Sequence, residues 1–265
     1  MFLINIIIYL IYLLMFINLF TYYYFSYIIK NNNIYIGDIM INSNDIKYLS
    51  SKLSFWPHIS EKEKNLLINS TISYSYNKNS NIHSKNNDCV GVVIIKKGCL
   101  RVYIISEDGK EITLYRLYEN DVCILSASCI LKNITFDVNI DIEEDSDILL
   151  INSTIFSKLS AQNIYVENFA LKSAADKFSD VMWTMNQILF MSFDKRLAIF
   201  LYEEMIKDSS NTINLTHNQI AKYIGSAREV VTRMLKYFAS EGIVELSRGK
   251  IIIINKNKLK NIINE

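Results

Sequence analysis

The sequence predicts an α+β protein in three parts: short antiparallel strands, one long helix, and a C-terminal helix-turn-helix followed by a β-hairpin wing. Three observations lead to this prediction. Runs of β-forming residues alternate with turn residues from Ile72 to Ile151. A regular apolar spacing of three and four residues then starts at Ile164. Finally, Leu215 to Asn255 contains two amphipathic helical patterns and two short apolar runs around a tight turn.

Length and composition fit a globular protein with a substantial core. The chain has 265 residues, of which half are hydrophobic, and its formal net charge is only +1. Its four cysteines, Cys89, Cys99, Cys123 and Cys129, are too few and too scattered for a disulfide-scaffolded secreted protein. We therefore expect a reducing compartment and a cytoplasmic location.

The first forty residues allow two interpretations. Phe2 to Ile29 has no charged residue and, at about 1.5 Å per residue, is long enough to cross a bilayer as a helix. Lys30 on its C-terminal flank would leave the remaining chain in the cytoplasm. The chain would then be a membrane-tethered sensor with residues 1 to 30 as its anchor.

The other interpretation makes residues 1 to 39 a mis-assigned hydrophobic segment. Met40 is a plausible start, and codons for Gly37 and Asp38 can contain a ribosome-binding sequence just upstream of it. The hydrophobic stretch would then be translated intergenic DNA. We expect the native protein to start at Met40 and to be soluble.

The middle of the chain has the pattern of a small antiparallel β-domain. A helix is expected first, at Glu61 to Asn69. Lys97-Gly98 indicates a turn, and Asp108-Gly109 is a strong hairpin signal. The expected strands are Val92 to Lys96, Leu100 to Ile105, Glu111 to Leu117, Val122 to Leu125, Thr135 to Ile140 and Asp147 to Ile151. Many short strands at such intervals favour a sandwich or barrel, which could hold a ligand or serve as scaffold.

A long helix is expected to follow. Its spacing of three and four selects eight positions, of which seven are apolar: Ile164, Glu167, Leu171, Ala174, Phe178, Val181, Met185 and Ile188. A seam this regular favours a coiled-coil interface over one side of a monomer core. A parallel homodimer would place two recognition helices about 34 Å apart, which matches a palindromic operator.

The helix-turn-helix is predicted by its cap, its turn and two apolar stripes. Thr216 is a candidate N-cap for a short helix, and Gly225 suits a tight turn. A second helix is expected at about Ala227 to Ala239. Its apolar stripe consists of Val231, Met234, Leu235 and Phe238.

The opposite face of the second helix suits DNA reading. It carries Arg228, Glu229, Thr232, Arg233 and Lys236. Arginine can donate two hydrogen bonds to guanine, and glutamate can accept one from cytosine N4. A merely solvated charged face is the alternative, but the predicted wing, Ile243 to Leu246 and Lys250 to Ile254, weakens it. Residues 213 to 265 hold nine Lys or Arg and four Glu, a net charge of +5 that suits phosphate contact.

In this order, the parts resemble the Crp/Fnr family of bacterial transcription regulators, named after the cyclic-AMP receptor protein and Fnr. The resemblance covers about Ile46 to Ile263, and its most specific segments are FDKRLAIFL, LTHNQIAKYIGSAREVVTRMLK and EGIVELSRGKIII. It implies a cyclic-nucleotide-binding-like β-roll effector domain at 46–160, a dimerisation helix at 161–191 and a winged helix-turn-helix DNA-binding domain at 192–265.

The resemblance also implies roles for individual residues. Arg228, Glu229 and Arg233 occupy the places of the family's R-E-x-x-x-R motif and are expected to read bases. The residues expected to contact the DNA backbone or position the domain are Thr216, His217, Ser226, Thr232, Lys236 and Arg248. Double-stranded DNA, a second copy of the chain and RNA polymerase are the expected partners.

The effector is not identified by the resemblance. Family members that bind cyclic AMP hold its phosphate with an arginine, but the comparable segment here, ENDVCILSASCIL, has none, so we expect no cyclic-AMP binding. An Fnr-type iron-sulfur cluster is not expected, because no cysteine precedes Cys89. Cys123 and Cys129 could be sensory thiols, although such cysteines are more often buried hydrophobes. The cofactor is therefore unknown, and the effector is a small molecule or a redox signal.

No metal site or enzyme activity is expected. His58, His83 and His217 have no metal-binding spacing, and no nucleophile or carboxylate pair stands out. An acidic cluster without EF-hand spacing is expected to form a solvated loop and strand face. It comprises Asp137, Asp141, Glu143, Glu144, Asp145 and Asp147.

Overall fold

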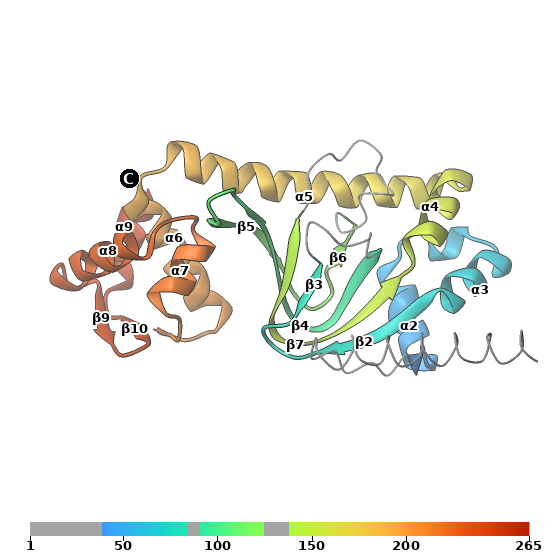
Figure 1. Cartoon of the computed structure of the whole chain (residues 1–265), viewed down its shortest axis with the longest axis horizontal. Helices are drawn as coiled ribbons and strands as arrows, with labels where there is room; N and C mark the ends of the chain where they lie inside the picture. The colour runs from blue at the N-terminus through green and yellow to red at the C-terminus, as the bar shows by residue number, and fades with distance from the viewer. Residues whose placement is uncertain (1–38, 84–90, 125–137, 265) are drawn as a thin grey trace, which may run out of the picture.

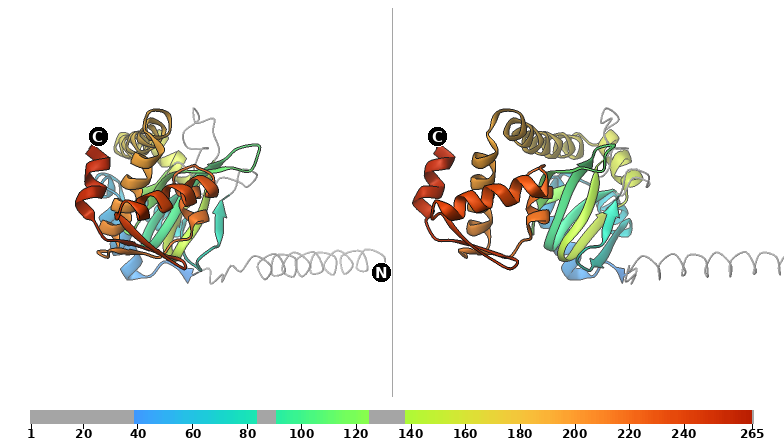
Figure 2. Two further views of the ribbon diagram at one scale, coloured as in Figure 1. Left: turned by 90° about the vertical axis from the view of Figure 1, so that its left-hand side faces the viewer. Right: turned by 60° about the vertical axis from the view of Figure 1, so that its left-hand side comes forward.

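The computed structural model describes residues 39–83, 91–124 and 138–264, and within these ranges it confirms the predicted α+β class. A curved antiparallel sheet is followed by the long helix α5 and then by a helical part with a wing. Figure 1 shows α5 running along the sheet, with α2 and α3 at one end of the molecule and the wing at the other. Figure 2 shows the same arrangement from two other directions.

The sheet has seven strands in the described residues, and every pairing is antiparallel. The main order is β1-β2-β7-β4-β5, with β3 on β7 and β6 on β4. The strands are β1 (Ile39–Met40), β2 (Thr71–Tyr76), β3 (Asn81–His83), β4 (Val92–Ile105), β5 (Glu111–Leu117), β6 (Val122–Cys123) and β7 (Asn139–Ile151). The β4–β5 hairpin turns where predicted, and the Gly109 amide donates to the Ser106 carbonyl at 2.9 Å.

The turn predicted at Lys97-Gly98 is wrong, because β4 runs through it as one strand. Gly98 has a φ of +96°, and a Cβ on it would lie 2.1 Å from Ser146 Oγ on β7. The pairing of β4 with β7 shifts register around this position. The glycine therefore allows a β-bulge and a close approach of two strands, where the sequence pattern indicated a chain reversal.

The acidic cluster was predicted to form a solvated loop and strand face; Asp137 lies outside the described residues, and its other five members lie on strand β7. β7 continues from Asn139 to Ile151 without a break, and Glu143 keeps only 13% of its side chain exposed. Glu143 forms ion pairs with Arg101 on β4 and with Arg116 on β5, so its charge is compensated inside the protein. The solvated face predicted for this cluster is therefore wrong for Glu143.

Several short helices pack together at one end of the sheet (Figure 1). They are α2 (Ser43–Lys52), the short η1 (Trp56–His58), α3 (Glu61–Asn69) and α4 (Ser153–Gln162). The bounds of α3 agree with the prediction; η1 and α4 were not anticipated, and neither was α2. Its start is defined by a capping box in which the Asn42 side chain accepts from the Asp45 amide at 3.0 Å. Phe55 and Phe156 are fully buried between these helices and the sheet.

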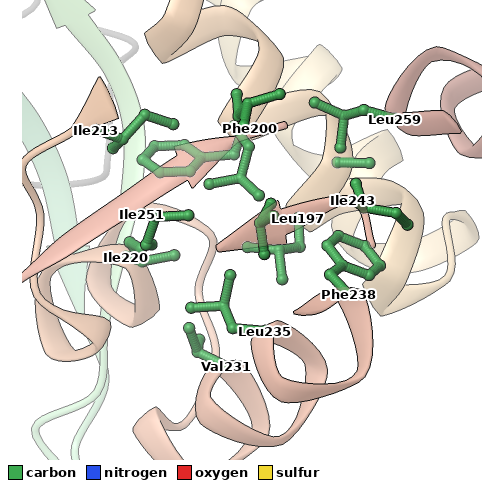
Figure 3. Close-up of a cluster of buried hydrophobic side chains, with 14 of the residues drawn as sticks. Leu197, Phe200, Ile213, Ile220, Val231, Leu235, Phe238, Ile243, Ile251 and Leu259 are labelled. Carbon is green, nitrogen blue, oxygen red and sulfur yellow. The ribbon is translucent and has the colours of Figure 1, made fainter. Parts of the chain in front are cut away.

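The helical part after α5 (Ile164–Phe190) has its own core. It contains α6 (Phe193–Lys207), β8 (Thr212–Ile213), α7 (His217–Tyr223), α8 (Arg228–Ser240), β9 (Val244–Ser247), β10 (Lys250–Ile253) and α9 (Lys256–Asn264). Figure 3 shows Leu197 of α6, Leu235 and Phe238 of α8, and Ile251 of β10 converging in this core. The wing strands lie within one residue of the predicted ends, and β8 and α9 add to the prediction.

Residues 1–38 fall outside the described ranges, and so does the hydrophobic segment on which the two N-terminal interpretations depend. Within the part of the chain that the structure describes, none of the helices has the length and apolar character needed to span a bilayer.

Truncating Phe238 should destabilise the helix-turn-helix more than any change at its surface. Phe238 is 0% exposed, and Phe238→Ala should cost about 3–5 kcal/mol through lost burial and the cavity left behind. Native-state hydrogen exchange of the α8 amides measures this loss. The neighbouring Tyr237→Ala is the control, because Tyr237 is 53% exposed and should change the opening free energy by less than about 1 kcal/mol. Equal losses in both variants would contradict the core position of Phe238.

Candidate nucleic-acid interface

The first helix of the motif, α7, begins at a capped residue as predicted. The Thr216 side chain accepts from the Gln219 amide at 3.2 Å, and the Thr216 amide donates to Gln219 Oε1 at 2.8 Å. This capping box satisfies amides that the first helical turn leaves without partners. Thr216 therefore has a structural role that is independent of any DNA contact.

The turn between α7 and α8 depends on Gly225. Its φ of +61° lies in the left-handed region, and a Cβ there would lie 3.3 Å from Ile112 Cγ1 on β5. The following Ser226 amide donates to the Ala221 carbonyl at 2.9 Å and closes the turn. Glycine satisfies both the backbone conformation and the contact with the sheet.

α8 separates an apolar face from a charged face, as its sequence pattern predicts. Val231, Leu235 and Phe238 are buried in the core and Met234 is half-buried against it. The predicted base-reading side chains Arg228, Glu229 and Arg233, together with Lys236, are all exposed. They line one shallow surface of α8 with Thr232 between them.

The wing extends this charged surface toward the start of α7. A groove between α7, α8 and the wing is lined by Thr216, His217, Arg228, Arg248 and Lys250. Residues 32 positions apart in sequence, Thr216 and Arg248, are thus neighbours in space. The structure brings the predicted backbone-contacting residues and the base-reading residues to one side of the domain, while Ser226 lies in the turn beside them.

His217 connects the two helices of the motif. Its Nδ1 lies 2.9 Å from Thr232 Oγ1, and that hydroxyl donates to the Arg228 carbonyl at 2.9 Å. Since the hydroxyl hydrogen is already used, His217 Nδ1–H is the donor in the first contact. Burial, followed by the nearby charges of Arg228 and Lys236, lowers the pKa of His217 below 6.5. A neutral imidazole thus positions Thr232 on the charged face.

Lys250 and Asn218 line the same side but were not singled out from the sequence. Lys250 lies on the wing strand β10 and shares the groove with Arg248. Asn218 follows His217 on α7 and is exposed. In the sequence, only the positive charge of the C-terminal segment indicated a role for Lys250. The position of Lys250 beside α8 depends on how the wing folds back.

Some of the predicted seam positions on α5 are exposed, whereas others pack against their own chain. Ile164, Leu171, Phe178 and Met185 are exposed, and Phe178 reaches 63%. Ala174 is half-buried. Val181 packs on the sheet core, and Ile188 lies beside Gly225, so both face their own chain. The exposed positions recur at four and three residues: Ile164, Asn168, Leu171, Ala175, Phe178, Met182, Met185 and Leu189.

The proposed thiol pair is only partly within the described residues. Cys123 is 0% exposed, and its Sγ lies 3.8 Å from the Tyr115 hydroxyl. Such burial suits the small apolar role that the sequence left as the alternative, since reactive thiols need access to solvent. Cys129 lies outside the described residues. Cys99 is also buried, which raises the pKa of its thiol to about 12.

The described residues contain no group of three or more His, Cys, Asp or Glu side chains that could hold a metal ion. The buried acids of the sheet instead pair with arginines. Arg116 Nε lies 3.0 Å from Glu143 Oε2, and Arg116 Nη1 donates to Glu204 Oε1 on α6. Although burial alone would lower the pKa of Arg116, these two carboxylates raise it.

A capped first helix, a glycine turn, an exposed charged second helix and a wing, joined by a long helix to an antiparallel roll, define a helix-turn-helix transcription regulator. Residues 195–262 match the model of the Crp-like helix-turn-helix domain. The chain is also 42% identical to a Eubacterium rectale protein described as a transcriptional regulator of the Crp/Fnr family, with a TM-score of 0.79. The match covers 81% of this chain and all of that one. The chain belongs to the Crp/Fnr family.

The chain is also similar to two more distant proteins. The anaerobic regulatory protein of Bacillus subtilis is 22% identical over 227 residues, which cover 81% of this chain and 93% of that protein. FixK2 of Bradyrhizobium japonicum shares the fold, with a TM-score of 0.57 and 18% identity over 72% of this chain and 96% of its own. The Bacillus subtilis protein is named as a regulatory protein and the Eubacterium rectale protein as a transcriptional regulator, which supports the prediction that the chain is not an enzyme.

Lowering the pH should loosen the contact between α7 and α8. Because folding lowers the pKa of His217, its contribution to stability is present above about 6.5 and is lost as pH falls through the folded pKa. Hydrogen exchange of α7 and α8 at pH of about 7.5 and 5.5 should show a larger loss of protection in the wild type than in His217→Asn. His58→Asn, remote from the motif, is the control. An equal pH effect in wild type and His217→Asn would contradict this role.

Proposed function

We propose that this protein is a homodimeric, sequence-specific transcription regulator that reads operator bases with Arg228, Glu229 and Arg233. The observation that carries the proposal is the exposure of these three side chains on one face of α8, opposite its buried stripe. A helix with a rigid apolar side and a free polar side can enter the major groove without losing core contacts. Arginine suits guanine, and Glu229 suits a cytosine amino group.

The surrounding residues suit the positioning of α8 on the duplex. Thr216, His217, Ser226, Thr232, Lys236 and Arg248 are the proposed backbone and positioning residues, and Lys250 joins them from the wing. Thr216 and His217 act partly through the protein, since they cap α7 and orient Thr232. Arg248, Lys250 and Lys236 supply positive charge that phosphates would neutralise.

The dimer is proposed to form along the exposed stripe of α5. Its eight positions alternate at four and three residues, seven of them are apolar, and Leu189 is 64% exposed. A monomer would leave this stripe in water, whereas two parallel helices would bury it as a coiled coil. Two copies related by a twofold axis would then present two recognition helices to a palindromic operator.

The β-roll is proposed to act as the effector domain, and RNA polymerase is the proposed partner at the promoter. The effector is a small molecule or a redox signal, and the absence of a phosphate-binding arginine in the sequence from Glu119 to Leu131 argues against cyclic AMP. Part of that segment, from residue 125 onward, lies outside the described residues. The domain limits proposed are 46–160, 161–191 and 192–265.

Selection of bound fragments from the host genome should yield a palindromic operator, and two substitutions then separate base reading from backbone contact. Arg228→Ala should cost about 1–3 kcal/mol on that operator and relax the preference at one base pair. Lys236→Ala should weaken operator and random DNA by similar factors and reduce the salt dependence. Electrophoretic mobility shifts on both duplexes measure the difference. Equal losses on operator and random DNA for both variants would remove the role given to Arg228.

Placing a charge in the α5 stripe should dissociate the dimer. Phe178→Glu would bury a carboxylate from each copy in the seam, and the dimer dissociation constant should rise at least roughly thirtyfold. Sedimentation equilibrium measures it. Ser179→Glu adds the same charge one residue away, at an exposed position outside the stripe, and should leave the dimer intact. A monomeric wild type, or equal effects of the two substitutions, would contradict the proposed seam.

A further inference from the structure

Strand β5 holds the helix-turn-helix against the β-roll through two ion pairs. Lys222 Nζ on α7 donates to Glu111 Oε1 at 2.7 Å. Arg116 Nη1 donates to Glu204 Oε1 on α6. β5 thus offers a carboxylate to one helix and a guanidinium to another. We call these contacts, Glu111–Lys222 and Arg116–Glu204, the interdomain ion pairs.

Each of the two β5 side chains, Glu111 and Arg116, also pairs with charged residues of the β-roll itself. Arg101, only 4% exposed, donates to Glu111 and lies 3.4 Å from Asp141. The Glu143 carboxylate on β7 forms an ion pair with Arg116, with Oε2 lying 3.0 Å from Nε. Exposed ion pairs are weak partly because their side chains must lose conformational freedom to meet. Glu111 and Arg116 are already held by β-roll partners, so their contacts with α7 and α6 can fix the orientation of these helices as well as attract them.

The same interface fixes the last turn of α7. The Thr113 hydroxyl on β5 donates to the Lys222 carbonyl at 3.2 Å, and the Arg116 guanidinium lies 3.8 Å from the centre of the Tyr223 ring. Lys222 and Tyr223 directly precede the Gly225 turn into α8. Because α7 and α8 share one core, fixing the end of α7 also fixes the direction in which α8 points.

The four side chains of the interdomain ion pairs line neither the charged surface of α8 nor the groove beside the wing. We infer that Glu111, Arg116, Lys222 and Glu204 are positioning residues that set the orientation of the recognition helix relative to the dimer axis. They thereby select the spacing between the two half-sites of the operator. This inference rests on the proposed function, because it presupposes a dimer that binds two half-sites.

The test uses Glu204→Gln and Lys222→Met in the full-length chain. Each removes one interdomain ion pair without stranding the other partner, because Arg116 keeps Glu143 and Glu111 keeps Arg101. The probes are a duplex with both operator half-sites, a duplex with one half-site, and a set in which the spacing between half-sites varies by single base pairs. Glu203→Gln is the control, because it removes the neighbouring charge on α6 without breaking a described ion pair.

The two variants should lose affinity for the full operator relative to the half-site by about three- to tenfold, because a freer domain must be ordered when both half-sites bind. The spacing preference should broaden as well. The affinity for the half-site duplex reports on the base-reading surface and should be unchanged in Glu204→Gln. A variant that has lost its fold would instead bind both the half-site and the full operator more weakly. Glu203→Gln should keep the wild-type ratio.

Unchanged ratios and spacing preference in both variants would overturn the inference. A full-site affinity that rises in the variants would also overturn it, because the ion pairs would then hold the domain away from the operator. If the wild type itself prefers neither full nor half operator over random DNA, the proposed function fails. The two failures are therefore distinguishable.

Discussion

The described structure depends on one buried guanidinium, that of Arg116, which joins three parts of the chain. It projects from β5, pairs with Glu143 of β7 and Glu204 of α6, and stacks on Tyr223 of α7. A guanidinium is costly to bury without a negatively charged partner, and here the surrounding elements supply two carboxylates. The raised pKa of Arg116 reflects this compensation. The sheet and the DNA-binding part are therefore held by charge as well as by apolar packing.

Helices α5 and α8 each use one face for packing within the protein and leave the other face exposed. α5 uses one side to pack on the sheet, where the Thr184 hydroxyl donates to the Leu114 carbonyl at 2.7 Å. Its other side leaves an apolar stripe in solvent. α8 does the same with charge, since its buried stripe holds the core and its free face carries Arg228 and Arg233. In both helices, the part available to a partner is the part that the protein's own core does not use.

Local patterns predicted the elements well where near neighbours determine the conformation. The Thr216 cap, the Gly225 turn and the bounds of α3 and β5 all follow from residues a few positions apart. The prediction was wrong at Gly98, because a glycine permits a bulge as readily as a turn and only the approach of β7 distinguishes them. The helical spacing of α5 was correct, but Val181 and Ile188 turn toward their own chain because the sheet and Gly225 are there to receive them.

The sequence by itself determined the classes of structure and chemistry: strands, then a long helix, then a helix-turn-helix with arginines on its free face. Periodicity and capping act over one or two turns of chain, so a single sequence is enough to recognise them. Only the tertiary structure decided which charges meet. Arg116 and Glu204 are 88 residues apart, and Thr113 contacts the Lys222 backbone across 109 residues. No local pattern specifies such pairs, because they exist only once the sheet has curved and the helical part has packed against its edge.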